Sequence, residues 1–156
     1  MENLRNEKRE LLRSTGKNYM IMVSEIPSIN KVRWTMVSIG SKGKEVIECF
    51  MSTEDMQALC TDILTGTFVE KLAADENECP SAYKYEMRKD KSVHLNIGNG
   101  KVGVRIQMHD YNLGVEYMMA VSLNKLEDMA AEYISDQETD YINSWIKENV
   151  LKRTDA

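Results

Sequence analysis

The chain has 156 residues, of which 42% are hydrophobic and 29% are charged. These proportions are typical of one globular domain and argue against a disordered chain. The net charge of −5 argues against a protein that binds nucleic acid over its whole surface. No apolar run approaches the roughly 18 residues of a membrane span, and the charged N-terminal segment MENLRNEKRELLRSTGK lacks the apolar stretch of a signal peptide. We therefore expect a soluble, intracellular protein without a membrane partner.

The first half predicts three strands and a helix. Residues 2–13 permit a short helix of their own, with three leucines on its face. Strands are expected at residues 19–23, 32–36 and 45–51, where apolar residues alternate with polar ones or run together between turn residues. Pro27 and Ser28 end the first of these strands, and residues 41–44 form a turn before the third.

A helix is expected to begin at Ser52-Thr53 and to end at Gly66, because these residues match the usual start and stop signals. Residues 73–81 are expected to form a polar loop. The core-facing side of the helix follows from helical spacing and comprises Met56, Leu59, Cys60 and Ile63.

The second half repeats this plan with four strands, expected at residues 83–87, 93–97, 102–108 and 115–121. Turns are expected at Asp90-Lys91, at Asn99-Gly100, which is a strong hairpin signal, and at residues 112–114. A helix follows, with a start signature at Asn124 and Glu127 and apolar residues at helical spacing. Those apolar residues are Leu126, Met129, Ala130 and Tyr133.

A final helix is expected at about residues 138–151, with one apolar stripe along it. The stripe comprises Tyr141, Ile142, Trp145, Ile146 and Val150. Burial against the protein's own sheet is the favoured interpretation, and docking of another subunit is the alternative.

The two halves align when the chain is shifted by 70 residues. Lys31-Val32 then falls on Lys101-Val102, Ser52 on Ser122, and Met56 on Leu126. The pattern predicts an α+β fold built from two antiparallel β-meander-plus-helix halves, at about residues 17–66 and 82–150, within a single domain that spans residues 1–156.

The three cysteines, Cys49, Cys60 and Cys79, are odd in number and too widely spaced for a CxxC pair or a disulfide framework. Cys49 and Cys60 lie among apolar neighbours and are expected to be reduced core residues, whereas Cys79 is expected in an exposed loop. This usage favours a cytoplasmic location.

Charge is distributed unevenly along the chain. Residues 1–50 hold nine Lys and Arg against six Asp and Glu, and residues 81–110 hold six against three. Residues 51–80 hold one against seven, and residues 111–156 hold four against nine. The strand segments are therefore basic and the helical segments acidic, so the exposed strand faces are expected to attract an anionic partner.

The candidate face combines Lys and Arg, which bind phosphates, with Asn, Gln and His, which contact bases. Its residues are Arg33, Thr35, Lys84, Arg88, His94, Asn96, Arg105 and Gln107. The alternative is the mixed polar face that antiparallel sheets commonly present to water.

Residues 98–103 spell GxGxxG, but a strand pattern follows where a dinucleotide site requires a helix, so a hairpin is expected. His94 and His109 lie on adjacent predicted strands, and their spacing matches no standard metal-ligand set. Neither histidine has an evident serine or cysteine partner. The sequence therefore predicts no enzyme, no metal and no cofactor.

The order strands–helix–strands–helix, with a polar strand face, resembles the Whirly and positive-cofactor-4 superfamily of single-stranded DNA binders. The resemblance is carried by the segment MVSIGSKGKEVIECFMSTEDMQALCTDI and by residues 84–134. It implies binding of single-stranded DNA or RNA without strict sequence preference, by homodimers or higher oligomers.

Two hypotheses follow. The first is a single-stranded nucleic-acid-binding accessory factor, acting in transcription or DNA metabolism, that binds across basic β-sheet faces. The second is a non-catalytic protein-interaction or oligomerisation module whose acidic helices make the contact.

Overall fold

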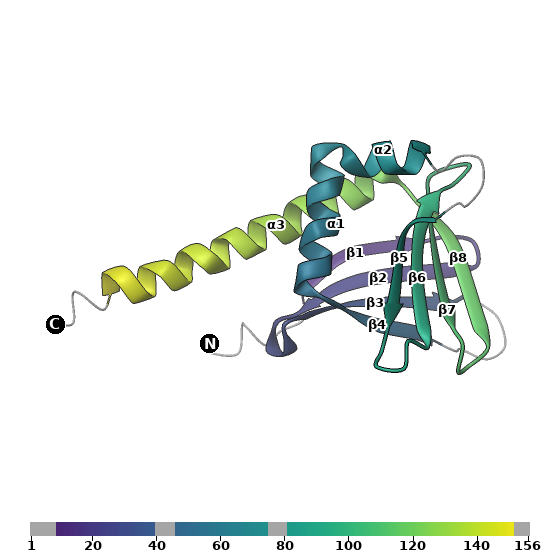
Figure 1. Ribbon diagram of the computed structural model, residues 1–156, viewed down its shortest axis with the longest axis horizontal. Helices are drawn as coiled ribbons and strands as arrows, with labels where there is room; N and C mark the ends of the chain where they lie inside the picture. Colours follow the sequence, from purple (N-terminus) through teal and green to yellow (C-terminus); the bar gives the residue numbers. More distant parts are fainter. Residues whose placement is uncertain (1–8, 40–45, 75–80, 152–156) are drawn as a thin grey trace.

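The computed structural model describes residues 9–39, 46–74 and 81–151, which form two β-sheets and the helices that follow each of them (Figure 1). In the first half the elements are β1 (Arg9–Thr15), β2 (Tyr19–Ile26), a 3₁₀ turn (Pro27–Ile29), β3 (Lys31–Ser38), β4 (Val46–Ser52), α1 (Thr53–Thr65) and α2 (Thr67–Ala74). In the second half they are β5 (Ser81–Met87), β6 (Val93–Asn99), β7 (Val104–Asp110), β8 (Val115–Val121), α3 (Leu123–Ile146) and a π turn (Lys147–Leu151).

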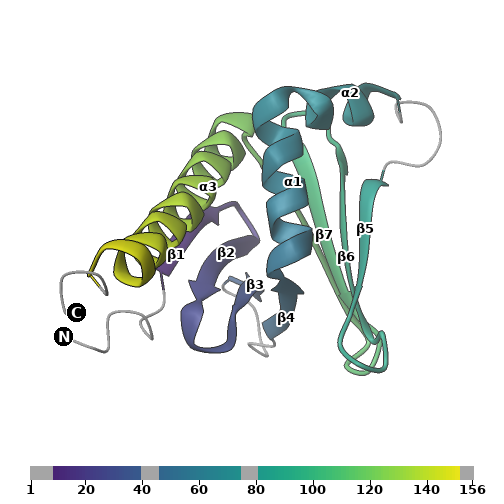
Figure 2. The same cartoon turned by 60° about the vertical axis from the view of Figure 1, so that its left-hand side comes forward.

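Each sheet is an antiparallel meander of four strands, in the order β1-β2-β3-β4 or β5-β6-β7-β8. Apolar side chains from one face of each sheet meet in a single core, which α1 and α3 cover (Figure 2). Trp34 and Tyr133 are the largest of the side chains that lie fully buried there. The prediction of an α+β fold with two meander-plus-helix halves is confirmed.

The 70-residue repeat is present in the structure. Ser52 caps α1 by accepting a hydrogen bond from the backbone N–H of Asp55, and Ser122 caps α3 in the same way with Lys125. The buried residues of the two helices are offset by the same interval. They are Met56, Leu59, Cys60 and Ile63 in α1, and Leu126, Met129, Ala130 and Tyr133 in α3.

The expectation of a helix at residues 2–13 is wrong for the described part of that segment. Residues 9–15 form β1, which pairs with β2 and gives the first sheet four strands instead of three. Its register shifts between Glu10 and Leu12, and both Leu11 and Leu12 are buried. A bulge of this kind lets two consecutive apolar residues enter the core, which hides the alternation that marks a strand.

The end of α1 is as expected, but α2 was not predicted, and the expected start and division of α3 need correction. Gly66 ends α1, with the positive φ of 87° that glycine tolerates, but α2 then follows directly and buries Phe68 and Leu72. The last two predicted helices are one continuous helix, α3, whose cap is Ser122 and not Asn124.

Among the smaller expectations, Pro27 does end β2, and Cys49 and Cys60 are buried. Burial raises the pKa of both thiols to about 12, so they stay protonated at neutral pH. Val102 was expected inside a strand, but β7 begins at Val104 and Val102 is 88% exposed in the hairpin loop. The turn at residues 41–44 and Cys79 lie outside the described residues.

Candidate nucleic-acid interface

The outer face of the sheet β5–β8 carries polar side chains in ordered rows across the strands. The register places Lys84, Asn96 and Gln107 opposite one another in one row. Arg105 lies in a neighbouring row, between Gly98 and Ala120. Because directly paired residues point to the same side of a sheet, these side chains form one surface. We call it the β5–β8 outer face.

The structure brings together five of the eight predicted site residues on this face: Lys84, His94, Asn96, Arg105 and Gln107. The other three lie elsewhere. Arg33 belongs to the other sheet and pairs with Glu48 at 3.6 Å. Thr35, expected to be exposed, is 6% exposed, between Met22 and Glu48 in the middle of the first sheet. Five of the predicted residues therefore share one sheet, and Arg33 and Thr35 lie on the other.

Arg88 ties the two sheets together instead of facing solvent alone. Its backbone has a φ of 70°, which is unusual for a residue with a side chain. Its Nη1 lies 3.3 Å from the fully buried carboxylate of Asp110, and its Nη2 donates to the backbone carbonyl of Glu48 at 3.2 Å. The charge of Arg88 is thus compensated, and this side chain has a structural role at the sheet junction.

A second row crosses the β5–β8 outer face, with two histidines flanked by two glutamates. His94 and His109 face each other, next to Glu86 and Glu116 respectively. His94 Nε2 lies 3.8 Å from the Glu86 carboxylate, and His109 Nδ1 lies 3.3 Å from that of Glu116. Glu116 also accepts a hydrogen bond from Gln107 at 2.8 Å. These contacts fix the orientation of the side chains and supply one carboxylate to each histidine.

Tyr111 completes this surface, and the sequence patterns did not single it out. Its ring stacks on His109, with centroids 3.8 Å apart, and meets His94 edge-on at 4.8 Å. The side chain is 56% exposed. The sequence did contain a signal for its exposure, because an aromatic residue in a tight turn directly after a strand cannot easily reach the core. Tyr111 supplies the exposed aromatic ring that stacking of a nucleobase requires.

The turn that holds Tyr111 is braced against the neighbouring turn of the same sheet. The Tyr111 N–H donates to the Ser92 carbonyl at 2.8 Å, and the Asn112 side chain donates to Asp90 at 3.3 Å. Hydrogen bonds from Ser92 and Asn112 lower the pKa of Asp90. These hydrogen bonds therefore hold in place the turn that carries the Tyr111 ring.

Residues 98–103, whose sequence spells GxGxxG, form the β6–β7 hairpin, as expected. A Cβ atom on Gly100 would lie only 2.5 Å from the carbonyl oxygen of Gly103. The tight loop accounts for glycine at this position, and β7 follows it in place of the helix that a dinucleotide site requires.

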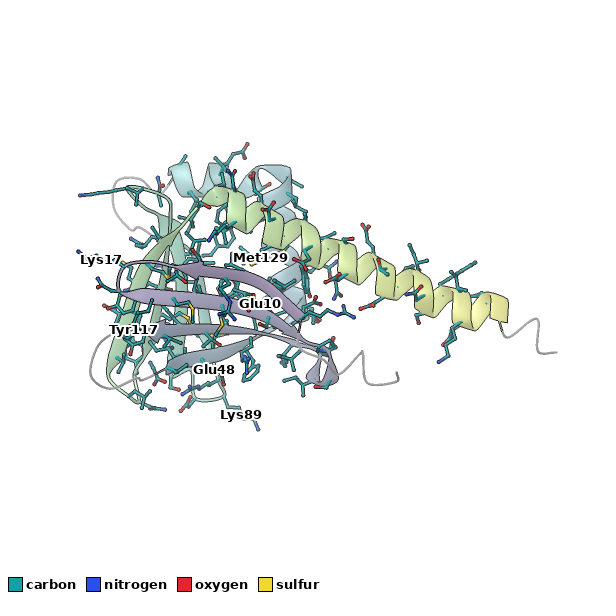
Figure 3. The ribbon with its side chains drawn as sticks, turned by 180° about the vertical axis from the view of Figure 1, so that it is seen from behind. Glu10, Lys17, Glu48, Lys89, Tyr117 and Met129 are labelled. Carbon is teal, nitrogen blue, oxygen red and sulfur yellow. The ribbon has the colours of Figure 1, made fainter. Side chains whose placement is uncertain are left out.

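A second candidate surface lies on the far half of α3, residues 135–146, which we call the α3 arm. Burial of α3 side chains ends at Tyr133, and the arm projects beyond the sheets in Figures 1 and 3. The apolar stripe expected to be buried is exposed, with Tyr141 at 71% and Trp145 at 52%. Ile142 and Ile146 are exposed as well, and the side chain of Val150 lies outside the described ones. The stripe continues into a groove of about 510 Å³ between α1 and α3.

Among the residues that the structure describes, no three His, Cys, Asp or Glu side chains are placed to hold a metal ion. No described helix combines the length and the hydrophobicity needed to cross a membrane. A comparison of the chain with models of known protein families found no match, and neither did a comparison with curated proteins.

Proposed function

We propose that this protein binds single-stranded nucleic acid across the β5–β8 outer face. The observation that carries the proposal is the combination of an exposed aromatic ring, Tyr111, with a row of phosphate- and base-binding side chains, Lys84, Asn96 and Gln107. Stacking of bases on an aromatic ring does not depend on their sequence, and Lys neutralises phosphates. Binding with little sequence preference follows from this chemistry.

Around this face five basic residues outnumber three acidic ones, because Lys84, Arg105 and three loop lysines stand against Glu86, Asp90 and Glu116. The β5–β6 turn adds Lys89 and Lys91, both exposed, and the β6–β7 hairpin adds Lys101. The acidic helices lie on the other side of the core (Figure 2). A polyanion would therefore meet the sheet and its loops before it met the helices.

The cellular role proposed here is an accessory factor in transcription or DNA metabolism, located in the cytoplasm, where the buried thiols of Cys49 and Cys60 would remain reduced. The resemblance to the Whirly and positive-cofactor-4 superfamily also remains a proposal. Two four-stranded meanders, each followed by a helix, support it.

Fluorescence anisotropy with a labelled single strand of about 30 nucleotides tests the proposal. Binding is expected at about 50 mM salt and should weaken toward about 200 mM, because counterions are released from the strand. Lys84→Glu should weaken binding about tenfold. Lys147→Glu makes the same charge change at the far end of α3 and should leave affinity unchanged. Absence of binding at the lower salt concentration would remove the proposal.

A second candidate function is self-association through the α3 arm. The arm leaves the apolar side chains of Tyr141 and Trp145 exposed, and a second copy would cover them. In a two-fold pair the same stripe meets itself, so one apolar surface serves both partners.

Sedimentation velocity distinguishes this function from the first. The protein is expected to sediment as a dimer, and Trp145→Glu should produce monomers while strand binding at the β5–β8 outer face persists. Asn143→Glu adds a negative charge at an exposed position of the same helix outside the stripe and should preserve the dimer. A monomer at all concentrations would exclude self-association without affecting the nucleic-acid proposal.

A further inference from the structure

A cavity of about 230 Å³ lies where α3 crosses the ends of β1, β2 and β3, away from the β5–β8 outer face. Glu25, at the end of β2, lines it and is 5% exposed. Asp140 of α3 lines it as well, and Asp136 lies beside them. Three carboxylates therefore gather around a small space at the edge of the core.

The groups around Glu25 leave one of its oxygens without a hydrogen bond. Gln137 donates to Oε1 at 3.5 Å, whereas Oε2 receives no hydrogen bond from the described residues. Arg9 stands 3.9 Å from Glu25 and Asp136 and 3.6 Å from Asp140, and all three separations exceed hydrogen-bond length. Once Glu25 is ionised, this buried oxygen lacks a donor, and a donor that enters the cavity would supply one.

With Glu25 ionised, the formal charge of the site favours a cation as that donor, which then takes the place of the proton. The three carboxylates face two cations, Arg9 and Lys31, so one negative charge is uncompensated when all of them are ionised. Water would satisfy the hydrogen bond but not the charge. No three His, Cys, Asp or Glu side chains of the described residues are placed to hold a metal ion. An ammonium group supplies both the charge and three N–H donors.

The rest of the cavity wall defines the remainder of the ligand. Ile26 and Val32 form an apolar side, and the hydroxyl-bearing residues Tyr133 and Ser144 line it from α3. We propose that this cavity binds a small organic molecule through a protonated primary amine. The ammonium would hydrogen-bond to Glu25 and Asp140, and a short carbon chain would contact Ile26 and Val32.

Binding of such a ligand is coupled to release of a proton. Burial and the neighbouring Asp136 raise the pKa of Glu25 to about 8, so this carboxyl is protonated in the empty site at neutral pH. The titratable groups that surround it are Arg9 on β1, Lys31 on β3, Cys60 on α1, and Tyr133, Asp136 and Asp140 on α3. An ammonium ligand must displace the proton, so its affinity should rise about tenfold per pH unit up to about pH 8 and then level off.

Titration of the isotope-labelled full chain with propylammonium chloride, followed by NMR, tests the proposal. Saturable shifts are expected at the backbone amides of Glu25, Val32 and Ser144 at about pH 8.5, with a dissociation constant on the order of 1 mM for so few heavy atoms. Sodium propionate and tetramethylammonium chloride, at equal ionic strength, should give none. An equal response to tetramethylammonium, or no saturable response to propylammonium, would overturn the proposal.

Two variants and a control locate the site. Glu25→Gln and Asp140→Asn should each weaken propylammonium binding at least about tenfold. Asp128→Asn, which removes a carboxylate from the same helix outside the cavity, should not. Asp140 has a side chain that is 57% exposed, so its variant should fold even if the Glu25 variant does not. Unchanged affinity in the Asp140 variant would contradict the assignment.

A lysine side chain of another protein carries the same chemistry as a free amine. Titration with Nα-acetyl-lysine methylamide separates the two sources. Binding of propylammonium, with or without the lysine derivative, supports the small-molecule site. Binding of the lysine derivative alone would overturn it in favour of a protein partner.

Discussion

The two halves of the molecule share a frame from β3 to the first helical turns and differ on either side of it. Offset by 70 residues, Ile47, Cys49 and Met51 of β4 correspond to Tyr117, Met119 and Val121 of β8, and all six are buried. The helices that follow repeat both the serine cap and the buried positions. The core of the fold is therefore built twice from one pattern.

The halves differ in the length of the preceding hairpin. Trp34 pairs with Val23, and its hairpin continues as far as the pair Ile26–Lys31. Val104, 70 residues after Trp34, pairs with Asn99, which is the last pair of its own hairpin. This is why Val32 is buried while its counterpart Val102 is 88% exposed. The extra length of the first hairpin carries Glu25 to α3 and creates the cavity there.

The halves also differ in their outer faces and in helix length. The outer face of the first sheet carries the exposed Phe50 and the ion pair between Arg33 and Glu48. The β5–β8 outer face instead carries the polar rows and Tyr111. After equivalent starts, α1 ends at Thr65 whereas α3 continues to Ile146. Each candidate functional surface therefore lies where the two halves differ. The parts that they share form the core and have a structural role.

Substitutions at equivalent core positions test the shared frame, with the largest expected effect. Met56→Ala and Leu126→Ala each empty part of the core at fully buried sites. Each should lower the free energy of unfolding by about 2–5 kcal/mol, as measured by urea denaturation. Gln57→Ala, on the exposed side of α1, is the matched control and should stay within about 0.5 kcal/mol of wild type. A small loss at only one core site would show that the halves are not equivalent.

The next largest effect is a pH dependence of stability that Glu25 confers on the first half alone. Its raised pKa, about 8, means that the folded state holds a proton that the unfolded chain releases near its ordinary value of 4.5. The free energy of unfolding should therefore fall as pH rises between these values, by at most about 1.4 kcal/mol per unit from this group. Glu25→Gln should remove this slope and be the more stable protein at about pH 8. Parallel urea titrations across this pH range provide the measurement, and an unchanged slope in the variant would contradict the assignment.

Sequence patterns predicted the second sheet well because its strands alternate strictly. Leu95, Ile97 and Ile106 point to the core and their polar neighbours point outward, as a half-buried antiparallel strand requires. The first sheet was harder, because the bulge near Leu11 and Leu12 breaks the alternation in β1. The helix α2 has only eight residues, too few for a clear period.

The candidate site was only partly predictable, because ion pairing and neighbours across strands depend on tertiary contacts. Alternation placed Lys84, Asn96 and Gln107 on an outer face. It did not reveal that Arg88 would be held by Asp110, 22 residues away along the chain. Nor did spacing show that Tyr111 would stack on His109, since that contact depends on the geometry of the turn.

Aromatic substitutions on the two outer faces test whether their difference matters for binding. Tyr111→Ala should lower affinity for a single-stranded oligonucleotide by about 1–3 kcal/mol, because a base loses its stacking partner. Phe50→Ala removes a partly exposed ring from the first sheet and should leave affinity unchanged. Tyr111→Phe keeps the ring and should bind as wild type does. Equal losses at Tyr111 and Phe50 would indicate a stability effect and would contradict a role for the β5–β8 outer face alone.

The smallest expected effect concerns the paired helix caps. Ser52→Ala and Ser122→Ala each remove the side-chain acceptor of one N–H in the first turn, that of Asp55 or of Lys125. Each should lower the free energy of unfolding by about 1 kcal/mol, whereas Ser135→Ala, on the exposed side of α3, should not. The Ser122 loss should be no larger than the Ser52 loss despite the greater length of α3, because a cap stabilises only the turn that it closes. A much larger loss at Ser122 would mean that the cap supports the whole α3 arm, and the two helix starts would then not be equivalent.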